Sequence, residues 1–239
     1  MELTKNELIK KLEHYRYLAG GSQGECYLDS REKIIYKIFH EFFQYSSNLS
    51  EQEIMQFSQI KNKTFIWPKE LITTNNHLIG YTTLYKKASN LCNMSPLKIN
   101  LDTLEKAIEI AGKDIEKITK QDVRIYDLMY NTLYDGKYLY IIDTIEYAHR
   151  KTNLWENRYP FDRELMYFLV EGYFNDFIEN NHLLNNLYQD TKTSSIDFLK
   201  VFRMKLSEYI GHEIKTLEEA KKLVTPVQSK KYIRIIKNK

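Results

Sequence analysis

The chain has 239 residues, of which 43% are hydrophobic and 28% charged, as expected for a folded protein with one domain or two small lobes sharing a cleft. A net charge of +3 and a pI near 8.5 are too mild for a dedicated nucleic-acid binder. Cys26 and Cys92 stand alone, without CxxC pairing or a histidine at metal spacing, which argues against a zinc site or a disulfide framework.

The N-terminal third of the chain predicts one helix and a set of strands. The first residues carry charges every few positions and no long apolar run, so we expect neither a signal peptide nor a membrane span there. A cytoplasmic location is expected as a result. Leu8, Ile9 and Leu12 predict a short amphipathic helix. Residues 17–39 then predict an antiparallel meander with a glycine-rich turn.

A second helix and two more strands follow the meander. Ile54, Phe57 and Ile60 recur at helical spacing after Ser50, which is a plausible N-cap. Extended segments are expected around residues 65–74 and 77–85. The polar stretch 86–96 is the expected connection between an N-terminal lobe, residues 1–85, and a C-terminal lobe, residues 86–239.

The second lobe is predicted to be mainly helical. Apolar residues recur in steps of three and four between Leu101 and Ile118, which predicts one face of a long helix. A hairpin is expected within residues 127–147, and helical patterns return from Pro160 onward. The order of elements predicts an α+β protein with a β-rich first third and a helical remainder.

Two features of the meander suggest a binding site. Gly20, Gly21 and Gly24 form either a plain hairpin turn or a loop whose backbone N–H groups can approach phosphate closely. Lys37 lies inside the apolar strand "IIYKIF", on the same alternating face as Ile35, so its charge needs a carboxylate or a ligand phosphate. Glu53 in the next helix is a candidate partner, although it can equally be a solvated helix residue.

The hairpin carries three oxygen-bearing side chains. Asp127 and Asn131 precede its apolar strand and Asp143 follows it. Each can be an ordinary turn former or cap. The order of glycine loop, strand lysine, helix glutamate and these three residues is much more specific than any one of them.

In this order the sequence resembles the protein-kinase-like fold, in its small atypical bacterial form, over residues 15–147. "AGGSQGEC" resembles the glycine-rich loop, and "IIYKIF" resembles the strand whose lysine holds the phosphates of ATP. The resemblance makes Lys37 the phosphate-binding lysine and Glu53 its ion-pair partner. "GYTTLYKKASNL" is similar to the hinge, which would place Thr83 at the back of the adenine pocket and Leu84 and Tyr85 beside adenine.

The resemblance also assigns roles to the hairpin. "IYDLMYNTLYDGKYLYIIDT" resembles the catalytic loop and the metal-binding aspartate, so Asp127 would orient the acceptor hydroxyl, and Asn131 and Asp143 would hold Mg²⁺. Magnesium prefers oxygen ligands, and phosphoryl transfer mainly requires positioning and neutralisation of the triphosphate. The resemblance thus implies a kinase that transfers the γ-phosphate of Mg-ATP to a hydroxyl of a protein or small molecule.

Several positions depart from the family pattern. Only three residues separate Asp127 from Asn131 where the family has four, and Ile125 and Tyr126 replace the His and Arg. Ala19 stands at the first glycine position, "DTI" replaces D-F-G, and no A-P-E motif follows. These departures favour an atypical or small-molecule kinase, or a pseudokinase that acts as a nucleotide-binding or partner-binding scaffold. A coincidence of motifs in an unrelated α+β protein is the third alternative.

Overall fold

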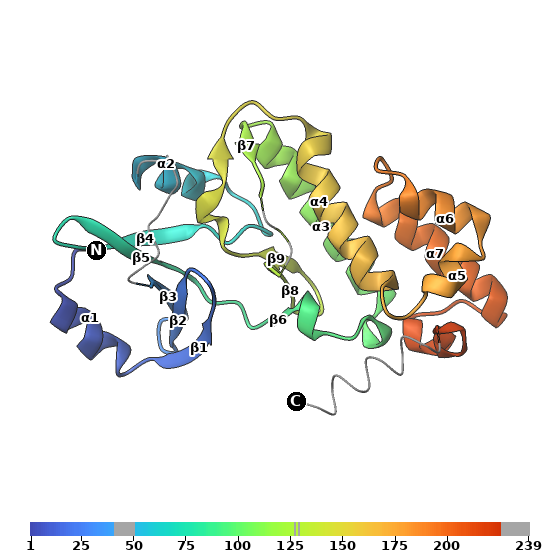
Figure 1. The fold of residues 1–239 in the computed structure, drawn as a ribbon, viewed down its shortest axis with the longest axis horizontal. Helices are drawn as coiled ribbons and strands as arrows, with labels where there is room; N and C mark the ends of the chain where they lie inside the picture. The colour runs from blue at the N-terminus through green and yellow to red at the C-terminus, as the bar shows by residue number, and fades with distance from the viewer. Residues whose placement is uncertain (41–50, 127, 129, 226–239) are drawn as a thin grey trace.

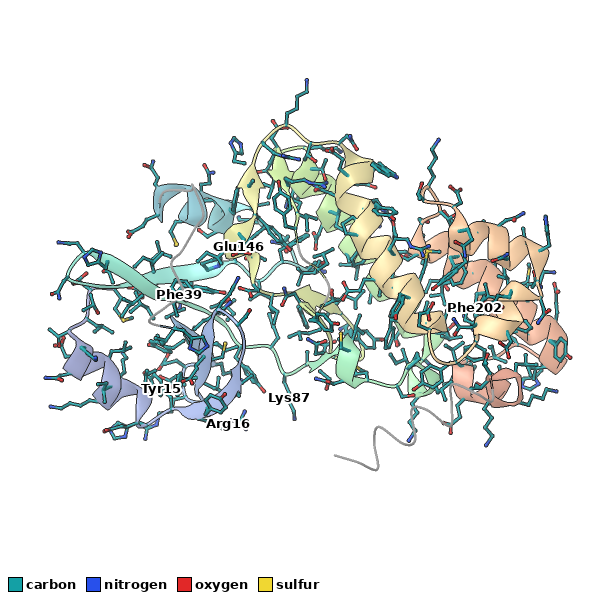
Figure 2. The ribbon with its side chains drawn as sticks, in the orientation of Figure 1. Tyr15, Arg16, Phe39, Lys87, Glu146 and Phe202 are labelled. Atoms are coloured by element: carbon teal, nitrogen blue, oxygen red, sulfur yellow. The ribbon has the colours of Figure 1, made fainter. Side chains whose placement is uncertain are left out.

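The protein consists of a β-sheet part and a helical part joined by an extended segment (Figure 1). The structure, a computed structural model, describes residues 1–40, 51–126, 128 and 130–225, without the side chains of Glu53 and Ile54. Figure 2 shows Lys87 on the segment that joins the two parts and Phe202 among the far helices. The prediction of an α+β fold with β-rich and helical regions is confirmed.

A five-stranded antiparallel sheet forms most of the first part. In spatial order its strands are β1 (Arg16–Gly20), β2 (Gly24–Asp29), β3 (Ile34–Phe39), β5 (His77–Leu84) and β4 (Pro68–Thr74). Successive side chains of a strand point to opposite faces, so β3 supplies two separate apolar clusters. Ile34 and Tyr36 pack on one face with Ile72, and Phe39 packs on the other with Tyr81.

One helix covers each face of this sheet (Figure 1). Helix α1 (Lys5–Leu12) begins with a capping box, in which Thr4 and Glu7 satisfy each other's backbone N–H groups. Its Leu12 and the following Tyr15 pack against the Tyr36 face. Helix α2 (Glu51–Gln56) places Met55 against the Tyr81 face. The face of the sheet that carries Tyr81 is called the inner face below, and Met55 of α2 and Ile145 of the helical part pack against it.

In the part of the chain that the structure describes, five α-helices follow the connection. They are α3 (Leu101–Thr119), α4 (Leu154–Val170), α5 (Asn175–Glu179), α6 (His182–Gln189) and α7 (Ser195–Ile210). Helix α3 buries the residues predicted from the three-and-four spacing, including Leu104, Ile108 and Ile115. Buried Asp162 of α4 accepts hydrogen bonds from the backbone N–H (2.9 Å) and hydroxyl (2.6 Å) of Ser195, which joins α4 to α7.

Short strands and 3-10 helices lie between the longer elements along the chain. Strands β6 (Ser89–Asn90), β8 (Thr132–Tyr134) and β9 (Leu139–Ile141) form one small sheet, and β7 (Val123–Arg124) pairs with β10 (Ala148–His149). The 3-10 helices are Phe57–Gln59, Leu91–Asn93, Pro96–Lys98, Thr144–Glu146 and Leu217–Leu223. The predicted hairpin within residues 127–147 is therefore formed by β8 and β9.

Helix α4 begins earlier than the sequence pattern suggests. We expected helical structure from Pro160 onward, but α4 starts at Leu154 and contains Pro160. A capping box between Asn153 and Glu156 starts the helix, and the proline lies in its second turn. The segment after Asp143 is shorter than expected as a result.

The apolar core of the helical part extends toward the sheet. Phe57, Phe65 and Trp67, which precede β4 in the chain, pack in the same cluster as the apolar face of α3. The division between residues 85 and 86 stays a prediction. No helix in the described part of the chain is both long enough and apolar enough to span a membrane.

Buried Asn157 joins α4 to the segment that contains β7, and its replacement tests how much this contact stabilises the protein. Its side chain accepts from the N–H of Ile125 (3.0 Å) and donates to the carbonyl of Val123 (2.8 Å), in the segment that leads to residue 127. Asn157→Leu leaves both backbone groups buried without a partner, so we expect a loss of about 2–5 kcal/mol in unfolding free energy. Urea denaturation followed by circular dichroism measures it.

Asn186→Leu is the matched control, because Asn186 is exposed on α6. We expect a change of no more than about 0.5 kcal/mol. Equal stability of the Asn157→Leu and Asn186→Leu proteins would contradict the role of Asn157.

Gly24 and Gly21 differ in the space that surrounds a side chain at their positions. A Cβ at Gly24 would lie 2.1 Å from the carbonyl oxygen of Ile38 on the paired strand, whereas a Cβ at Gly21 would meet nothing within 4 Å. We expect Gly24→Ala to lower the unfolding free energy by about 1–3 kcal/mol, because a strand must shift to admit the methyl group. Gly21→Ala should change it by no more than about 0.5 kcal/mol, and parallel urea titrations that rank the two variants equally would refute the assignment.

Candidate active site

The site is built around Lys37 in the middle of β3. Lys37 pairs with Cys26 of β2 and Tyr81 of β5, so the three side chains share the inner face of the sheet. The Lys37 side chain is only 10% exposed, and its Nζ forms an ion pair with Oδ1 of Asp143. The sequence predicts that this strand lysine needs a carboxylate or a ligand phosphate, and in the structure a carboxylate from the helical part pairs with it.

Asp143 is held in place by its backbone conformation and by neighbours on both sides. It has a left-handed backbone (φ 60°, ψ 46°) directly before the 3-10 helix Thr144–Glu146. The Tyr81 hydroxyl donates to Oδ1 of Asp143 at 3.1 Å, and the Thr144 hydroxyl donates to the carbonyl of Ile66 at 3.3 Å. Ile145 is buried against Tyr81 in the inner cluster of the sheet. These contacts fix the carboxylate under β3.

The glycine-rich loop reaches the same site through Gln23. Lys37 Nζ donates to Oε1 of Gln23 at 2.7 Å, and Nε2 of Gln23 donates to Oε1 of Glu146 at 3.0 Å. His40 contacts the Gly21 carbonyl with its ring nitrogen at 2.9 Å. Figure 2 shows Glu146 and Phe39 on the two sides of this junction. The loop is therefore hydrogen-bonded to both β3 and the residues after Asp143.

The three glycines do not serve as turn glycines with a positive φ. The described glycines with positive φ are Gly136, Gly172 and Gly211, all outside this loop. Gly24 is required by the close approach of β3, as described above. Gly21 leaves open space where a Cβ would stand, so a ligand can approach its backbone closely, although its own N–H already donates to the carbonyl of Gly24 at 2.9 Å.

Asn131 lies beside Asp143 across the β8–β9 hairpin. The Asn131 carbonyl accepts from the N–H of Ile142 at 3.0 Å, and its own N–H donates to Leu128 at 2.9 Å. Asn131 therefore pairs with Ile142, the residue before Asp143, and its predicted role as a metal ligand together with Asp143 stays a prediction. Asp127 lies outside the described residues, so its predicted role stays a prediction.

The remaining predicted residues fall in two places. Glu53 belongs to α2, but its side chain lies outside the described part of the structure, and its pairing with Lys37 stays a prediction.

The predicted hinge residues lie at the end of β5. Thr83 is buried on the Lys37 face and donates its hydroxyl to the carbonyl of Trp67 at 3.0 Å. The Tyr85 N–H donates to the carbonyl of Lys33 at 2.9 Å, so the backbone group that Tyr85 has left for a ligand is its carbonyl. Leu84 is 48% exposed and points to the opposite face from Thr83.

Sequence reasoning missed Gln23, Tyr81 and Glu146. Tyr81 shares the alternating face of Thr83, which is a signal that the sequence contains. Gln23 and Glu146 meet only because the chain folds, since 123 positions separate them. Cys26, for which the sequence indicates no metal or disulfide role, lies on the Lys37 face; burial raises its thiol pKa, nearby Lys37 lowers it and Asp143 raises it.

The oxygen donors at the site suit one hard cation. In the described ranges no three His, Cys, Asp or Glu side chains gather to form a metal cage. Mg²⁺ commonly binds proteins through one or two oxygen ligands and takes the others from substrate phosphates and water. Asp143 and Asn131 fit that requirement, and the Lys37 ammonium beside them fits a phosphate.

Comparison with known proteins finds similarity in structure but not in sequence. No protein-family model and no curated protein sequence matches the chain. Among solved structures, the PK-1 kinase of Cydia pomonella granulovirus is similar with a TM-score of 0.53 and 16% identity, over 90% of this chain and 96% of that one. The protein therefore has a protein-kinase-like fold, as its sequence motifs predict.

Proposed function

We propose that this protein is a phosphotransferase that moves the γ-phosphate of Mg-ATP to a hydroxyl group of a protein or small molecule. The observation that carries the proposal is the Lys37–Asp143 ion pair next to the glycine-rich loop. It brings a phosphate-binding cation and a metal-binding carboxylate together, from segments 106 positions apart, in a kinase-like fold.

In this proposal the N-terminal residues bind and orient the nucleotide. Lys37 binds the α- and β-phosphates, and the loop contacts the phosphates near Gly21, where a Cβ would meet nothing within 4 Å. A phosphate oxygen would take the place of the Gln23 Oε1 atom that Lys37 now contacts. Adenine would lie toward Thr83, next to backbone groups of Leu84 and Tyr85.

The hairpin residues act on the metal and the acceptor. Asp143 and Asn131 would hold Mg²⁺, which supplies charge neutralisation at the phosphates. Asp127 orients the acceptor hydroxyl and receives its proton as the acceptor oxygen bonds to the γ-phosphorus. The bond from that phosphorus to the β–γ bridging oxygen breaks, and ADP leaves.

A nucleotide-binding scaffold without transfer activity is the second candidate function. It is favoured by the short Asp127-to-Asn131 spacing and by Ile125 and Tyr126 at the positions of the family His and Arg. The Gln23 contacts also favour it, because Gln23 competes with a ligand for Lys37. The two functions differ in whether labelled phosphate leaves ATP.

Replacement of Asp143 separates these functions. Asp143→Asn keeps the size of the side chain and tolerates the left-handed backbone, but removes the charge that a metal ion needs. With radiolabelled ATP and pools of proteins and small molecules, we expect wild-type transfer to fall by about 100-fold or more. Thermal shift with ATP, with and without Mg²⁺, should show that the variant has lost the metal-dependent part of the stabilisation.

Asp122→Asn is the matched control, because Asp122 is exposed and also has a left-handed backbone, with φ of 55°. It should retain both transfer and the thermal shift. A wild-type protein that shows the Mg-dependent shift but transfers no label would support the scaffold. Absence of any shift would refute nucleotide binding altogether.

Cys26 offers a test of nucleotide position that does not depend on activity. In the Cys92→Ser background, where Cys26 is the remaining cysteine, saturating Mg-ATP should slow its alkylation by N-ethylmaleimide about tenfold or more, because the ligand would cover the Lys37 face. The raised thiol pKa means that the rate without ligand should still be rising above pH 9.0, the ordinary value for a thiol. Mass spectrometry follows the modified peptide; an unchanged rate at a concentration of ATP that gives a thermal shift would exclude this placement.

A further inference from the structure

A basic groove lies apart from the candidate active site, where the loop before β4, the end of β5 and the β8–β9 hairpin meet. It has a volume of about 680 Å³. Four lysines line it, Lys61, Lys63, Lys69 and Lys86, and its lining contains no aspartate or glutamate. Leu84 lines it from the sheet face opposite to Tyr81 and Thr83, which places the groove on the other side of β5 from the Lys37 site.

The lysines of this basic groove carry uncompensated charge. Within the part of the chain that the structure describes, none of the four forms an ion pair with a carboxylate. The nearby carboxylates of Asp114 and Asp135 do not line the groove. Asp114 accepts from the backbone N–H of Lys63 (2.9 Å), and Asp135 accepts from the Tyr140 hydroxyl (2.8 Å). The groove is therefore a site of positive potential.

The aromatic rings in the basic groove favour carboxylates over nucleic-acid bases. Lys63 and Lys137 place their ammonium groups 5.7 and 5.1 Å from the Tyr138 ring centroid, and Lys86 lies 5.2 Å from that of Tyr140. Bases bind proteins without sequence preference by stacking on open aromatic faces. These faces are already engaged by cations, which leaves the ammonium groups to bind the ligand.

Leu84 adds an apolar contact to this charge pattern. Its side chain is 48% exposed at the groove, beside the buried Trp67 and Pro68. An acidic side chain can pair with the rim lysines while an apolar neighbour covers Leu84. A chain segment that mixes acidic and apolar residues matches both properties.

We propose that the basic groove binds an acidic segment of a partner protein, with its carboxylates on Lys61, Lys63, Lys69 and Lys86 and an apolar side chain on Leu84. This binding needs no phosphoryl transfer and goes beyond the function proposed above. It gives either an active kinase or a scaffold a place to hold a protein partner outside the nucleotide site.

The test measures fluorescence anisotropy of a labelled peptide of glutamate, leucine and serine on the full-length protein. We expect roughly micromolar affinity that weakens as salt is added. The double variant Lys63→Glu/Lys86→Glu should weaken binding about tenfold or more. The matched control Lys106→Glu/Lys221→Glu makes the same change of net charge at exposed lysines outside the groove and should bind as the wild type does.

Further arms decide between ligand classes. A peptide with lysine in place of glutamate should not bind, and a single-stranded oligonucleotide should bind more weakly than the acidic peptide. Tighter binding of the oligonucleotide, equal losses in the two double variants, or no binding of the acidic peptide would each overturn the proposal. Lys61→Gln/Lys69→Gln, which neutralises two exposed lysines of the same groove, should also weaken binding and repeats the test if the first variant misfolds.

Discussion

The arrangement of this protein depends on one buried ammonium group. Lys37 lies on the inner face of the sheet, where an unpaired charge would be costly, and Asp143 compensates it from the helical part. The pair therefore joins the two parts at the point where the glycine-rich loop and the β8–β9 hairpin meet. Its geometry also accounts for Tyr81 on the inner face and Gln23 in the glycine-rich loop, since both hydrogen-bond to members of the pair.

Much of the fold follows from local patterns in the sequence. The apolar run in residues 34–39 predicts a strand of an antiparallel meander, and the spacing from Leu101 to Ile118 predicts the buried face of α3; both are observed. The predicted start of α4 was wrong. The helical pattern from Pro160 onward suggested that the helix begins there, whereas the Asn153–Glu156 capping box starts it at Leu154. The packing of Phe57 and Trp67 into the helical core could not be predicted, because it depends on contacts far apart in the chain.

The site was predictable to the extent that its chemistry is local. A lysine inside an apolar strand indicates that its ammonium group needs an anionic partner, and the sequence predicts that this partner is a carboxylate or a ligand phosphate. The sequence does not show that Asp143 pairs with Lys37, as it does in the structure, and the predicted pairing of Lys37 with Glu53 stays a prediction. Gln23 and Glu146 carry no motif; only the folded loop brings an amide and a carboxylate within 3.0 Å. Asn131 was chosen from its order relative to Asp143, and the hairpin hydrogen bond pairs it with Ile142, the residue before Asp143.

The basic groove and the candidate active site share one piece of backbone. Phe65 and Ile66 line the groove and pair with Ile141 of β9, where the N–H of Ile66 donates to Ile141 at 2.9 Å. The chain then reaches Asp143 two residues later, and the Thr144 hydroxyl returns to the Ile66 carbonyl. The same hydrogen bonds that form the groove wall at Ile66 therefore also hold the segment that carries Asp143 toward Lys37.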